Sequence, residues 1–309
     1  MKVNKALFEN IGRIIIGIVF ILSALFKYLS IENVDLFFFE HGVFNWVFTT
    51  FVSRFLIAIE TILGLMLIFR IYPKVSYLLS LLFLSFFSLY IILKPYLFDV
   101  STENCFCFGD VLVFNDIQTL IKNIILILIV LFLIPRKGKK NRYSKVLLIL
   151  FSITSIGAVY SINPPDIIKA KIFNNSVSIN YKAFEDLSNL NNVKELKINE
   201  GKKVICLYST GCKYCKFAAK KISIIITNNN LHKDSFIEIF WGNRKNVDSF
   251  HKEANIDSIS YTFVPAPLFL EATKNKQPII ILLNNGKIEK LYKLTTIDER
   301  YIVSFLTNK

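Results

Sequence analysis

The segment KVICLYSTGCKYC, residues 203–215, joins an apolar run to a Ser-Thr-Gly turn and a Cys-x-x-Cys pair. The apolar run predicts a buried strand, and the small residues after it predict a turn. Apolar residues at helical spacing then continue to about Thr227. Cys212 and Cys215 are therefore expected in the first turn of a helix that follows a buried strand. This placement favours a redox-active dithiol.

A Cys-x-x-Cys pair at a strand-to-helix turn is the redox placement of a thioredoxin-like fold. The N-terminus of a helix lowers the pKa of the first thiol, and Lys213 can add to that effect, so we expect Cys212 to be the attacking thiolate. Cys215, one turn further on, is expected to be the buried resolving thiol. Half of a zinc ribbon is the alternative, but the sequence contains no second Cys-x-x-Cys.

The sequence after this pair supports the same α/β fold. Residues 236–240 predict a second strand, and residues 277–288 predict a hairpin with an Asn-Gly turn. A final helix is expected over about 297–307. Residues 180–309 resemble thioredoxin-like proteins, and the resemblance implies that Pro278, which opens the hairpin, is cis and lies against the cysteine pair. The usual Trp-Cys-Gly-Pro-Cys motif is absent, so partner preference and reduction potential do not carry over.

Other reactive side chains in this half have ordinary interpretations. Cys206 lies inside the expected strand and is predicted to be a core thiol without a chemical role. His232 and His251 are predicted to lie on the surface.

The first half of the chain has the composition of a membrane protein. Apolar residues make up 53% of the sequence, and runs of roughly 20 apolar residues, long enough to cross a bilayer, recur five times. The first run could be a signal peptide, but it lacks a clear cleavage site, so we expect a retained helix. The five expected spans are 12–30, 51–70, 75–94, 117–135 and 145–162.

These runs predict three regions. Residues 1–140 are expected to form an α-helical membrane bundle of four helices. Residues 141–165 are expected to form a fifth span and a linker, and residues 166–309 an α/β thioredoxin-like domain.

Charge predicts the orientation of the spans. Lys and Arg concentrate near the N-terminus, at 70–74 and at 136–145, whereas acidic residues concentrate in the 31–50 and 95–116 loops. By the positive-inside rule, the basic segments are cytoplasmic. An odd number of spans then places the C-terminal domain outside the membrane, in the same compartment as the 95–116 loop. We therefore expect a multi-pass protein of the bacterial cytoplasmic membrane with an extracytoplasmic C-terminal domain.

Glu60 lies midway through the second expected span. A carboxylate at that depth costs at least about 2.5 kcal/mol unless it is paired or protonated, so it is expected to face the bundle interior. One interpretation is a structural pair with Lys27 or Arg13 of the first span. The other is a proton or quinone-binding group, for which Glu60, Lys27 and Arg13 are the candidate residues.

Cys105 and Cys107 form a second cysteine pair, in the outer loop at 95–116. A disulfide between residues i and i+2 closes a small strained ring, and strain makes such a bond oxidising and labile. Two unreactive thiols or half of a metal site are the alternatives, although closed zinc sites need four ligands.

Over residues 8–135 the chain resembles the MauE/DoxX redox-associated membrane proteins. The resemblance implies a four-helix bundle concerned with disulfide chemistry in exported proteins, and DoxX-type relatives suggest contact with quinone. Its most specific element is the Cys-x-Cys-Phe-Gly motif, in which Phe106 replaces a residue that is commonly Gly. The pattern consists of Arg13, Gly17, Ser23, Lys27, Glu60, Gly64, Cys105, Cys107, Phe108 and Gly109.

These observations predict a membrane-bound thiol–disulfide oxidoreductase with redox-active disulfides and a quinone cofactor. The N-terminus, the 136–145 loop and the spans contain no cysteine, so a thiol relay from the cytosol has no carrier. Electrons are therefore expected to pass from exported protein thiols to Cys212 and Cys215, then to Cys105 and Cys107, and on to the membrane quinone pool. The alternatives are a reductase or isomerase for exported proteins, and copper handling by the two pairs.

Nucleic acid is not an expected partner. The formal net charge is +14, but no basic stripe with interleaved aromatic residues accompanies it.

Overall fold

A computed structural model describes residues 2–41, 44–97, 114–134, 141–172, 177–256 and 259–307. The chain divides into two compact units, Met1–Pro165 and Asp166–Lys309. We describe each unit by itself.

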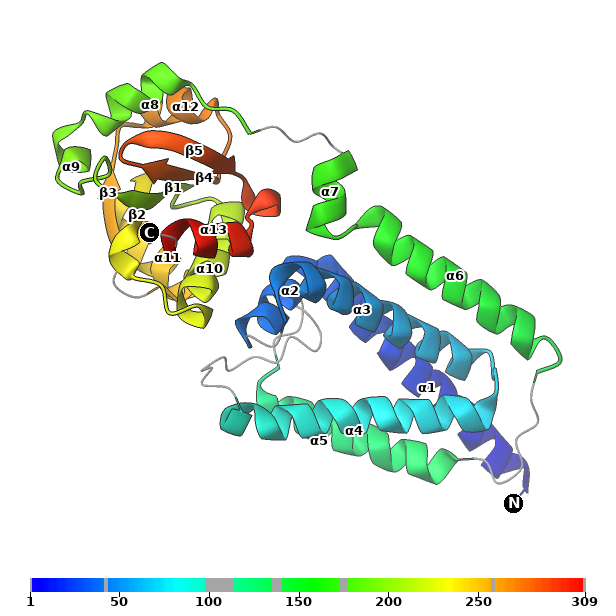
Figure 1. Cartoon of the computed structure of the whole chain (residues 1–309). Coiled ribbons are helices and arrows are strands. Elements are labelled where there is room, and N and C mark those ends of the chain that lie inside the picture. Colours follow the sequence, from blue (N-terminus) through cyan, green and yellow to red (C-terminus); the bar gives the residue numbers. More distant parts are fainter. Residues whose placement is uncertain are drawn as a thin grey trace. The chain divides into compact units, whose positions relative to one another are not determined.

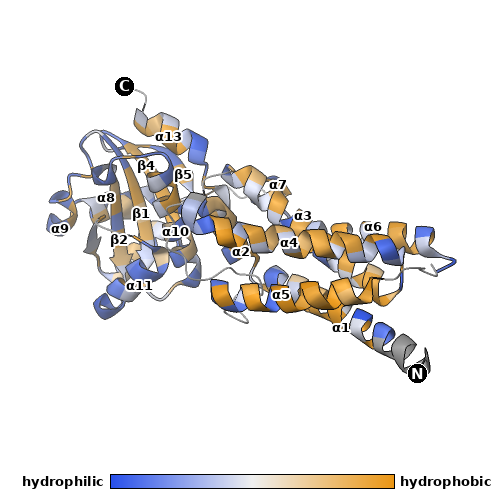
Figure 2. Cartoon of the chain, turned by 90° about the horizontal axis from the view of Figure 1, so that it is seen from below, coloured by the Kyte–Doolittle hydropathy of each residue, from blue (hydrophilic) through white to orange (hydrophobic). Residues whose placement is uncertain are grey.

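The first unit is helical (Figure 1). Five of its helices in the described ranges are long and apolar enough to cross a membrane, which confirms the five predicted spans to within a few residues. Figure 2 shows these five as predominantly hydrophobic along their length. The short helix α2 was not predicted, because its acidic residues identified that segment as a loop. The helices are α1 (Lys2–Leu29), α2 (Ile31–Glu40), α3 (Trp46–Ile68), α4 (Pro73–Leu97), α5 (Asp116–Leu133) and α6 (Ser144–Ile162).

Helix α3 is the centre of this unit. It packs against α1, α2, α4 and α6, while α5 packs against α4 and α1. The helices α1, α3, α4 and α5 thus form a four-helix bundle, and α6 adds to the outside of α3. Half of the most apolar window of α3 is buried, against 11% for α6. Most of the apolar surface of α6 is therefore available to lipid.

Two glycines bring α1 and α3 together. A Cβ atom at Gly17 would lie 2.8 Å from the carbonyl oxygen of Gly64, and one at Gly64 would lie 2.8 Å from the carbonyl oxygen of Gly17. Only residues without a side chain allow the two backbones this approach, as is common where membrane helices cross.

The second unit is an α/β domain built on a five-stranded sheet in the order β3-β2-β1-β4-β5. β1, β2 and β3 run parallel, and β4 and β5 complete the sheet as an antiparallel hairpin. The strands are β1 (Lys202–Ser209), β2 (Phe236–Trp241), β3 (Ser260–Phe263), β4 (Ile279–Asn284) and β5 (Lys287–Tyr292).

Helices cover both faces of the sheet (Figure 1). Ile205 and Leu207 of β1 face a core built with residues of α8 and α12. Because side chains alternate along a strand, Cys206 and Tyr208 face the opposite side, where Tyr208 meets Phe250 of α11. The helices are α7 (Asp166–Ile172), α8 (Tyr181–Ser188), α9 (Asn191–Lys194), α10 (Lys213–Asn228), α11 (Val247–Ala254), α12 (Ala266–Thr273) and α13 (Glu299–Thr307).

The predicted thioredoxin-like arrangement is confirmed in its main elements. The strand before the cysteine pair, the helix after it, the strand at 236, the hairpin and the last helix are all present. Asn285 and Gly286 both have positive φ, as a two-residue hairpin turn requires. The edge strand β3 and helix α12, inserted between β2 and β4, were not predicted.

Candidate functional site

The cysteine pair of the α/β domain lies where β1 gives way to α10. Cys212 is the N-cap of α10, and its Sγ accepts a hydrogen bond from the backbone N–H of Cys215 at 3.2 Å. Cys212 is partly exposed, whereas Cys215 is completely buried. The Sγ of Cys215 accepts a longer hydrogen bond, 3.5 Å, from the backbone N–H of Ser209. One thiol is therefore accessible to solvent, and the other is buried beside it.

The two thiols are electrostatically different. Hydrogen bonding from Cys215, joined by the backbone N–H of Tyr214, lowers the pKa of Cys212 from 9.0 to about 6. Burial raises the pKa of Cys215 far above its usual range, and its contact with Cys212 raises it further. Cys212 is thus the more acidic and more exposed of the two thiols, which are the properties that an attacking thiolate needs. Lys213, which we expected to help, instead places its ammonium group 5.4 Å from the ring of Phe217.

Pro278 lies at the same edge of the sheet as the cysteine pair. The peptide bond between Gln277 and Pro278 is cis. Strand β4 begins directly afterwards, with Ile279 paired to Leu207 near the end of β1. The side chain of Gln277 accepts a hydrogen bond from the indole N–H of Trp241 at 2.8 Å, which ties this loop to the end of β2.

In the membrane unit, Glu60 is buried and its Oε2 lies 2.6 Å from the Nζ of Lys27. The same ammonium group donates to the Oγ of Ser23 at 3.1 Å. Glu60 therefore faces the bundle interior and pairs with Lys27. The structure does not bring Arg13 to this group.

Arg13 instead binds the C-terminal end of α3, where its guanidinium donates to the carbonyl oxygens of Leu67 and, at 2.6 Å, of Ile68. Its distance from Lys27 along α1 explains the separation, because fourteen residues of helix span about 21 Å. Arg13 thus completes the end of a neighbouring helix. The structure therefore does not bring Arg13 together with Lys27 and Glu60, and cofactor binding by these residues stays a prediction.

A narrow cavity lies beside Lys27. It is lined by residues of α1, α2, α3 and α4, among them Lys27, Phe37, Ser53, Phe87 and Tyr90, and about 20 Å³ of it is open to a water-sized sphere. The hydroxyl of Tyr90 is buried without a hydrogen-bond partner among the described residues. A hydroxyl group in this position could donate a hydrogen bond to a carbonyl group, such as that of a quinone. The volume is room for about one water, so a quinone ring enters only if the aromatic side chains move.

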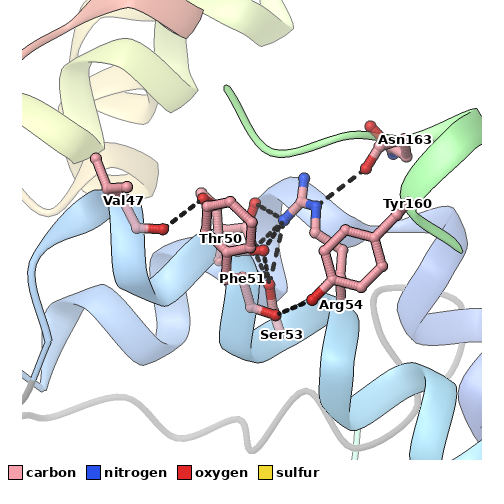
Figure 3. Close-up of polar contacts among 8 residues, drawn as sticks. Val47, Thr50, Phe51, Ser53, Arg54, Tyr160 and Asn163 are labelled. Carbon is pink, nitrogen blue, oxygen red and sulfur yellow. Dashed lines mark hydrogen bonds and ion pairs between the residues drawn. The ribbon is translucent and has the colours of Figure 1, made fainter. Parts of the chain in front are cut away.

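The most extensive polar network of the membrane unit surrounds Arg54, and sequence reasoning missed it. The guanidinium contacts both carboxylate oxygens of Asp35 at 2.7 Å and donates to the backbone oxygen of Asn163 at 3.0 Å. Figure 3 shows the guanidinium between Thr50 and Ser53 of α3 and the chain beyond α6. The hydroxyl of Tyr160 adds a hydrogen bond to the carbonyl oxygen of Phe51 at 2.9 Å.

These contacts join α2 and the end of α6 to α3. Their signal in the sequence was the pair of opposite charges at 35 and 54, of which only the acidic residue was interpreted, as part of a loop. An arginine so close to an apolar run needs a partner in the same way as Glu60 does.

The second cysteine pair, Cys105 and Cys107, lies outside the described residues. The segments on either side of it are joined by an ion pair between Lys94 Nζ of α4 and Asp116 Oδ2 of α5, at 3.0 Å. Lys94 is almost completely buried. The ion pair therefore holds α4 to α5 near the end of the first described range and the start of the next.

Burial tests three predictions about side chains of the α/β domain. Cys206 is buried, as expected of a core thiol. His232 is exposed, also as predicted. His251 is only partly exposed, with 17% of its side chain accessible, and its Nε2 lies 2.6 Å from the Oε2 of the buried Glu238, a partner that the surface prediction did not include. A charged residue within the apolar strand 236–241 was the signal that a partner had to exist.

Comparison with known proteins supports both units. Residues 5–136 match the family model described as methylamine utilisation protein MauE. Protein TlpB of Flavobacterium psychrophilum is 25% identical, and the alignment covers 94% of this chain and 92% of TlpB. No solved structure matches the chain significantly. The chain therefore resembles MauE over residues 5–136 and carries a C-terminal α/β domain with a thioredoxin-like arrangement.

Proposed function

We propose that this protein is a membrane-bound thiol–disulfide oxidoreductase that oxidises exported protein thiols. One observation carries the proposal: Cys212, partly exposed at the N-cap of α10, has a pKa lowered to about 6 and stands over the buried Cys215. A thiolate that is available at neutral pH and a buried resolving thiol are the two parts that disulfide exchange requires. The MauE-like unit supports a place in the membrane.

The proposed electron path begins at the substrate. Two substrate thiols reduce the Cys212–Cys215 disulfide, and the resulting thiols reduce a disulfide between Cys105 and Cys107. That second pair passes its two electrons to an oxidant in the membrane, which we propose to be quinone. Tyr90, whose buried hydroxyl lacks a partner among the described residues, would donate to a quinone carbonyl once the aromatic side chains beside the narrow cavity move apart, and the bound quinone would supply two-electron oxidation.

The relay between the two pairs is tested by trapping its intermediate. Cys215→Ser removes the thiol that resolves a mixed disulfide, so Cys212 should remain linked to Cys105 or Cys107. The two pairs belong to one chain, which keeps their effective concentration high, on the order of mM for a short linker. A non-reducing digest analysed by mass spectrometry detects the linked peptides. If both segments are observed well and no link exists, the relay within one chain is wrong.

The direction of electron flow and the identity of the membrane oxidant are tested together. The redox state of each pair is measured in membranes from cells with and without quinone. We expect both pairs to be mainly oxidised with quinone and to become reduced without it. Two pairs that stay reduced in both strains would instead favour a reductase or isomerase.

The proposal also requires the α/β domain to lie outside the cytoplasmic membrane. Protease added to intact spheroplasts should remove this domain. Protection of the domain in spheroplasts, with digestion after the membrane is opened, would contradict the proposed topology and with it the exported substrate.

A further inference from the structure

The sheet of the α/β domain has a free edge that the proposed chemistry does not use. β3 is the last strand on its side of the sheet (Figure 1), and no strand of the described residues pairs with its outer side. An edge strand presents unpaired backbone groups to which another extended chain can add. The outer side of β3 is therefore a candidate binding surface for a polypeptide.

The hydrogen bonds of β3 show which of its backbone groups are free. The N–H of Val264 donates to the carbonyl oxygen of Phe240 in β2 at 2.9 Å. Backbone groups alternate in direction along a strand, so every second residue counted back from Val264 faces β2, whereas Tyr261 and Phe263 face outward. Asn192 of α9 donates to the outward carbonyl oxygen of Phe263 at 2.9 Å. The outward N–H groups of both residues and the carbonyl group of Tyr261 have no partner among the described residues.

A groove beside this edge has the size and the charge of a ligand site. About 670 Å³ of it is open to a water-sized sphere, and ligand sites occupy about 300–1,000 Å³. Arg244 is the one charged residue among the described residues that line the groove, and its guanidinium carbon lies 5.3 Å from the centre of the Phe263 ring. A guanidinium group binds a carboxylate through two parallel hydrogen bonds. The groove therefore fits an extended chain that carries an acidic side chain.

The groove is continuous with the loop that carries the redox pair. Gly242 lines the groove and packs against Thr210, two residues before Cys212, and a Cβ atom at Gly242 would lie 2.6 Å from the Oγ1 of Thr210. The hydroxyl of Thr210 also donates to the carbonyl oxygen of Asn243 at 3.3 Å. β2 alone separates β3 from β1, so the ends of β3 and β1 lie about 10 Å apart. An extended chain covers that distance in about three residues.

We propose that this groove binds an extended segment of the client, meaning the exported protein that is oxidised, as an added strand on β3. An acidic side chain of the client pairs with Arg244. The client cysteine then lies about three to five residues along the chain, at Cys212. The inference rests on the proposed exchange activity and deepens it, since it states which form of a client is bound and which residue selects it.

Recognition through the backbone suits a protein that acts on many clients. An added strand is held by N–H and C=O groups that every sequence has, and only Arg244 recognises a side chain. A folded protein has already used these groups in its own helices and sheets, whereas an unfolded chain has them available. The groove therefore selects client segments that are still unfolded.

Binding in the groove brings the sulfur atoms together for an ordinary exchange. A client thiolate attacks the Sγ of Cys212 in the Cys212–Cys215 disulfide, and the S–S bond breaks as Cys215 leaves with the electron pair. A second client thiolate then attacks the client sulfur of the mixed disulfide and releases Cys212 as a thiolate. The client gains a disulfide, the protein pair gains two electrons, and the two client thiol protons reach the reduced pair by way of solvent. Arg244 touches the client away from the reacting atoms, so it determines specificity only.

The test measures exchange between the full-length protein and synthetic peptides. A Cys105→Ser/Cys107→Ser background leaves Cys212–Cys215 as the reactive disulfide, and its reduction is followed by acid quenching and mass spectrometry. Each peptide is unstructured, contains a pair of cysteines, and carries either Asp or Asn four residues to each side of the pair. Dithiothreitol, a small neutral dithiol, reports the reactivity of the disulfide without use of the groove.

Arg244→Gln should slow the reaction with the Asp peptide at least about tenfold, as expected when a hydrogen-bonded charge is lost, and leave that with dithiothreitol within about twofold. The Asn peptide should react as slowly with the unsubstituted protein, and the two changes together should cost little more. Lys245→Gln is the matched control, because it removes an exposed cation of the same loop that does not line the groove. It should change each rate by no more than about twofold.

The added strand has a test of its own. The N–H groups of a bound strand that face β3 alternate along the peptide, so N-methylation of every second residue blocks them in one register and spares them in the other. One methylated peptide should react at least about fivefold more slowly, and the other within about twofold of the unmethylated peptide. The second peptide controls for the effect of the methyl groups on peptide conformation.

Two results would overturn the inference directly. One is an Asp peptide that reacts equally fast with the Arg244→Gln and Lys245→Gln proteins. The other is an equal effect of N-methylation in the two registers, which would show that no strand is added.

Other occupants of the groove give different results, which also contradict the assignment. If Arg244→Gln weakens only the trapped link between Cys212 and Cys105 or Cys107, the groove serves that pair and not a client. If a second copy of the chain covers the groove, the rate constant with peptide should fall as the protein concentration rises. Failure of the proposed function itself looks different, since the unsubstituted protein would then react with dithiothreitol and with none of the peptides.

Discussion

Each unit of this protein contains a buried acid–base pair with the same 2.6 Å contact, and the two pairs have different surroundings. In the membrane unit, Lys27 and Glu60 join α1 to α3 among apolar helices. In the α/β domain, His251 and Glu238 join α11 to the central sheet, beside the thiol of Cys206. The first pair therefore lies between two membrane helices, and the second lies beside a buried thiol.

The difference lies in the basic partner as well as in the neighbours. Histidine changes its charge between pH 5 and 8, whereas lysine keeps its charge there unless it is strongly desolvated. A pair that contains histidine is therefore suited to exchange protons at physiological pH. A lysine–glutamate pair between two membrane helices is suited to fix them, so we expect its loss to appear mainly as lost stability.

The largest expected effect is that of Lys27→Met, which leaves the carboxyl group of Glu60 buried without its cation. Removal of one partner from a buried ion pair costs about 3–5 kcal/mol. The thermal unfolding temperature of the protein in detergent should fall accordingly. The double variant Lys27→Met/Glu60→Leu should recover most of the loss, because no buried charge then remains. Equal stability of the single variant and the unsubstituted protein would show that the pair does not hold α1 to α3.

A smaller loss is expected from Gly64→Ala, which tests whether close helix packing brings Lys27 to Glu60. The new Cβ would lie 2.8 Å from the carbonyl oxygen of Gly17, so the helices must move apart. Overpacking of this kind costs about 1–3 kcal/mol. Gly157 of α6 is the matched control, because a Cβ there meets nothing within 4 Å. Gly157→Ala should be neutral or slightly stabilising, and equal losses in the two variants would contradict the close crossing.

The sequence was sufficient for features that depend on local pattern. Five apolar runs became five helices, and the strand, turn and Cys-x-x-Cys motif placed Cys212 at the N-cap of α10. The pairing of Glu60 with Lys27 also followed, because a carboxylate in a span needs a partner and few candidates existed.

Features that depend on the folded arrangement could not be predicted in the same way. Asp35 was assigned to a loop because its segment is acidic, so its pairing with Arg54 was missed. His251 was assigned to the surface, and only the packing of α11 against the sheet brings it to Glu238. A single sequence contains no information on which polar residues of separate elements meet, whereas periodicity reports burial directly.

The third prediction concerns the pH dependence of the reduced α/β domain. The pKa of Cys212 falls from 9.0 to about 6 on folding, so its contribution to stability is complete above pH 9 and is lost as the pH falls to about 6. The gain is on the order of 1 kcal/mol once screening of this partly exposed thiol is allowed for. Urea unfolding of a Trp46→Phe protein, followed by Trp241 fluorescence, measures this domain. Cys212→Ser should remove the rise between pH 6 and 9, and a flat profile in the protein that retains Cys212 would contradict the shift.

The smallest effect is expected at the exposed pair between Lys216 and Glu253, which sharpens the comparison between the two buried pairs. Its 2.6 Å contact matches theirs, but the two side chains are 27% and 52% exposed. Exposed pairs contribute about 0–1 kcal/mol, since water and salt screen them. Glu253→Gln should therefore change stability by less than about 0.5 kcal/mol.

Glu253→Gln should also leave the titration of Cys212 in place, measured by thiolate absorbance, because hydrogen bonding from Cys215 and the backbone lowers that pKa. A loss of several kcal/mol in the free energy of unfolding would contradict this expectation, and so would a large change in the titration of Cys212. Either result would mean that the contact distance of an ion pair, and not its burial, determines its contribution. The distinction between the membrane pair and the pair beside the thiols would then need another basis.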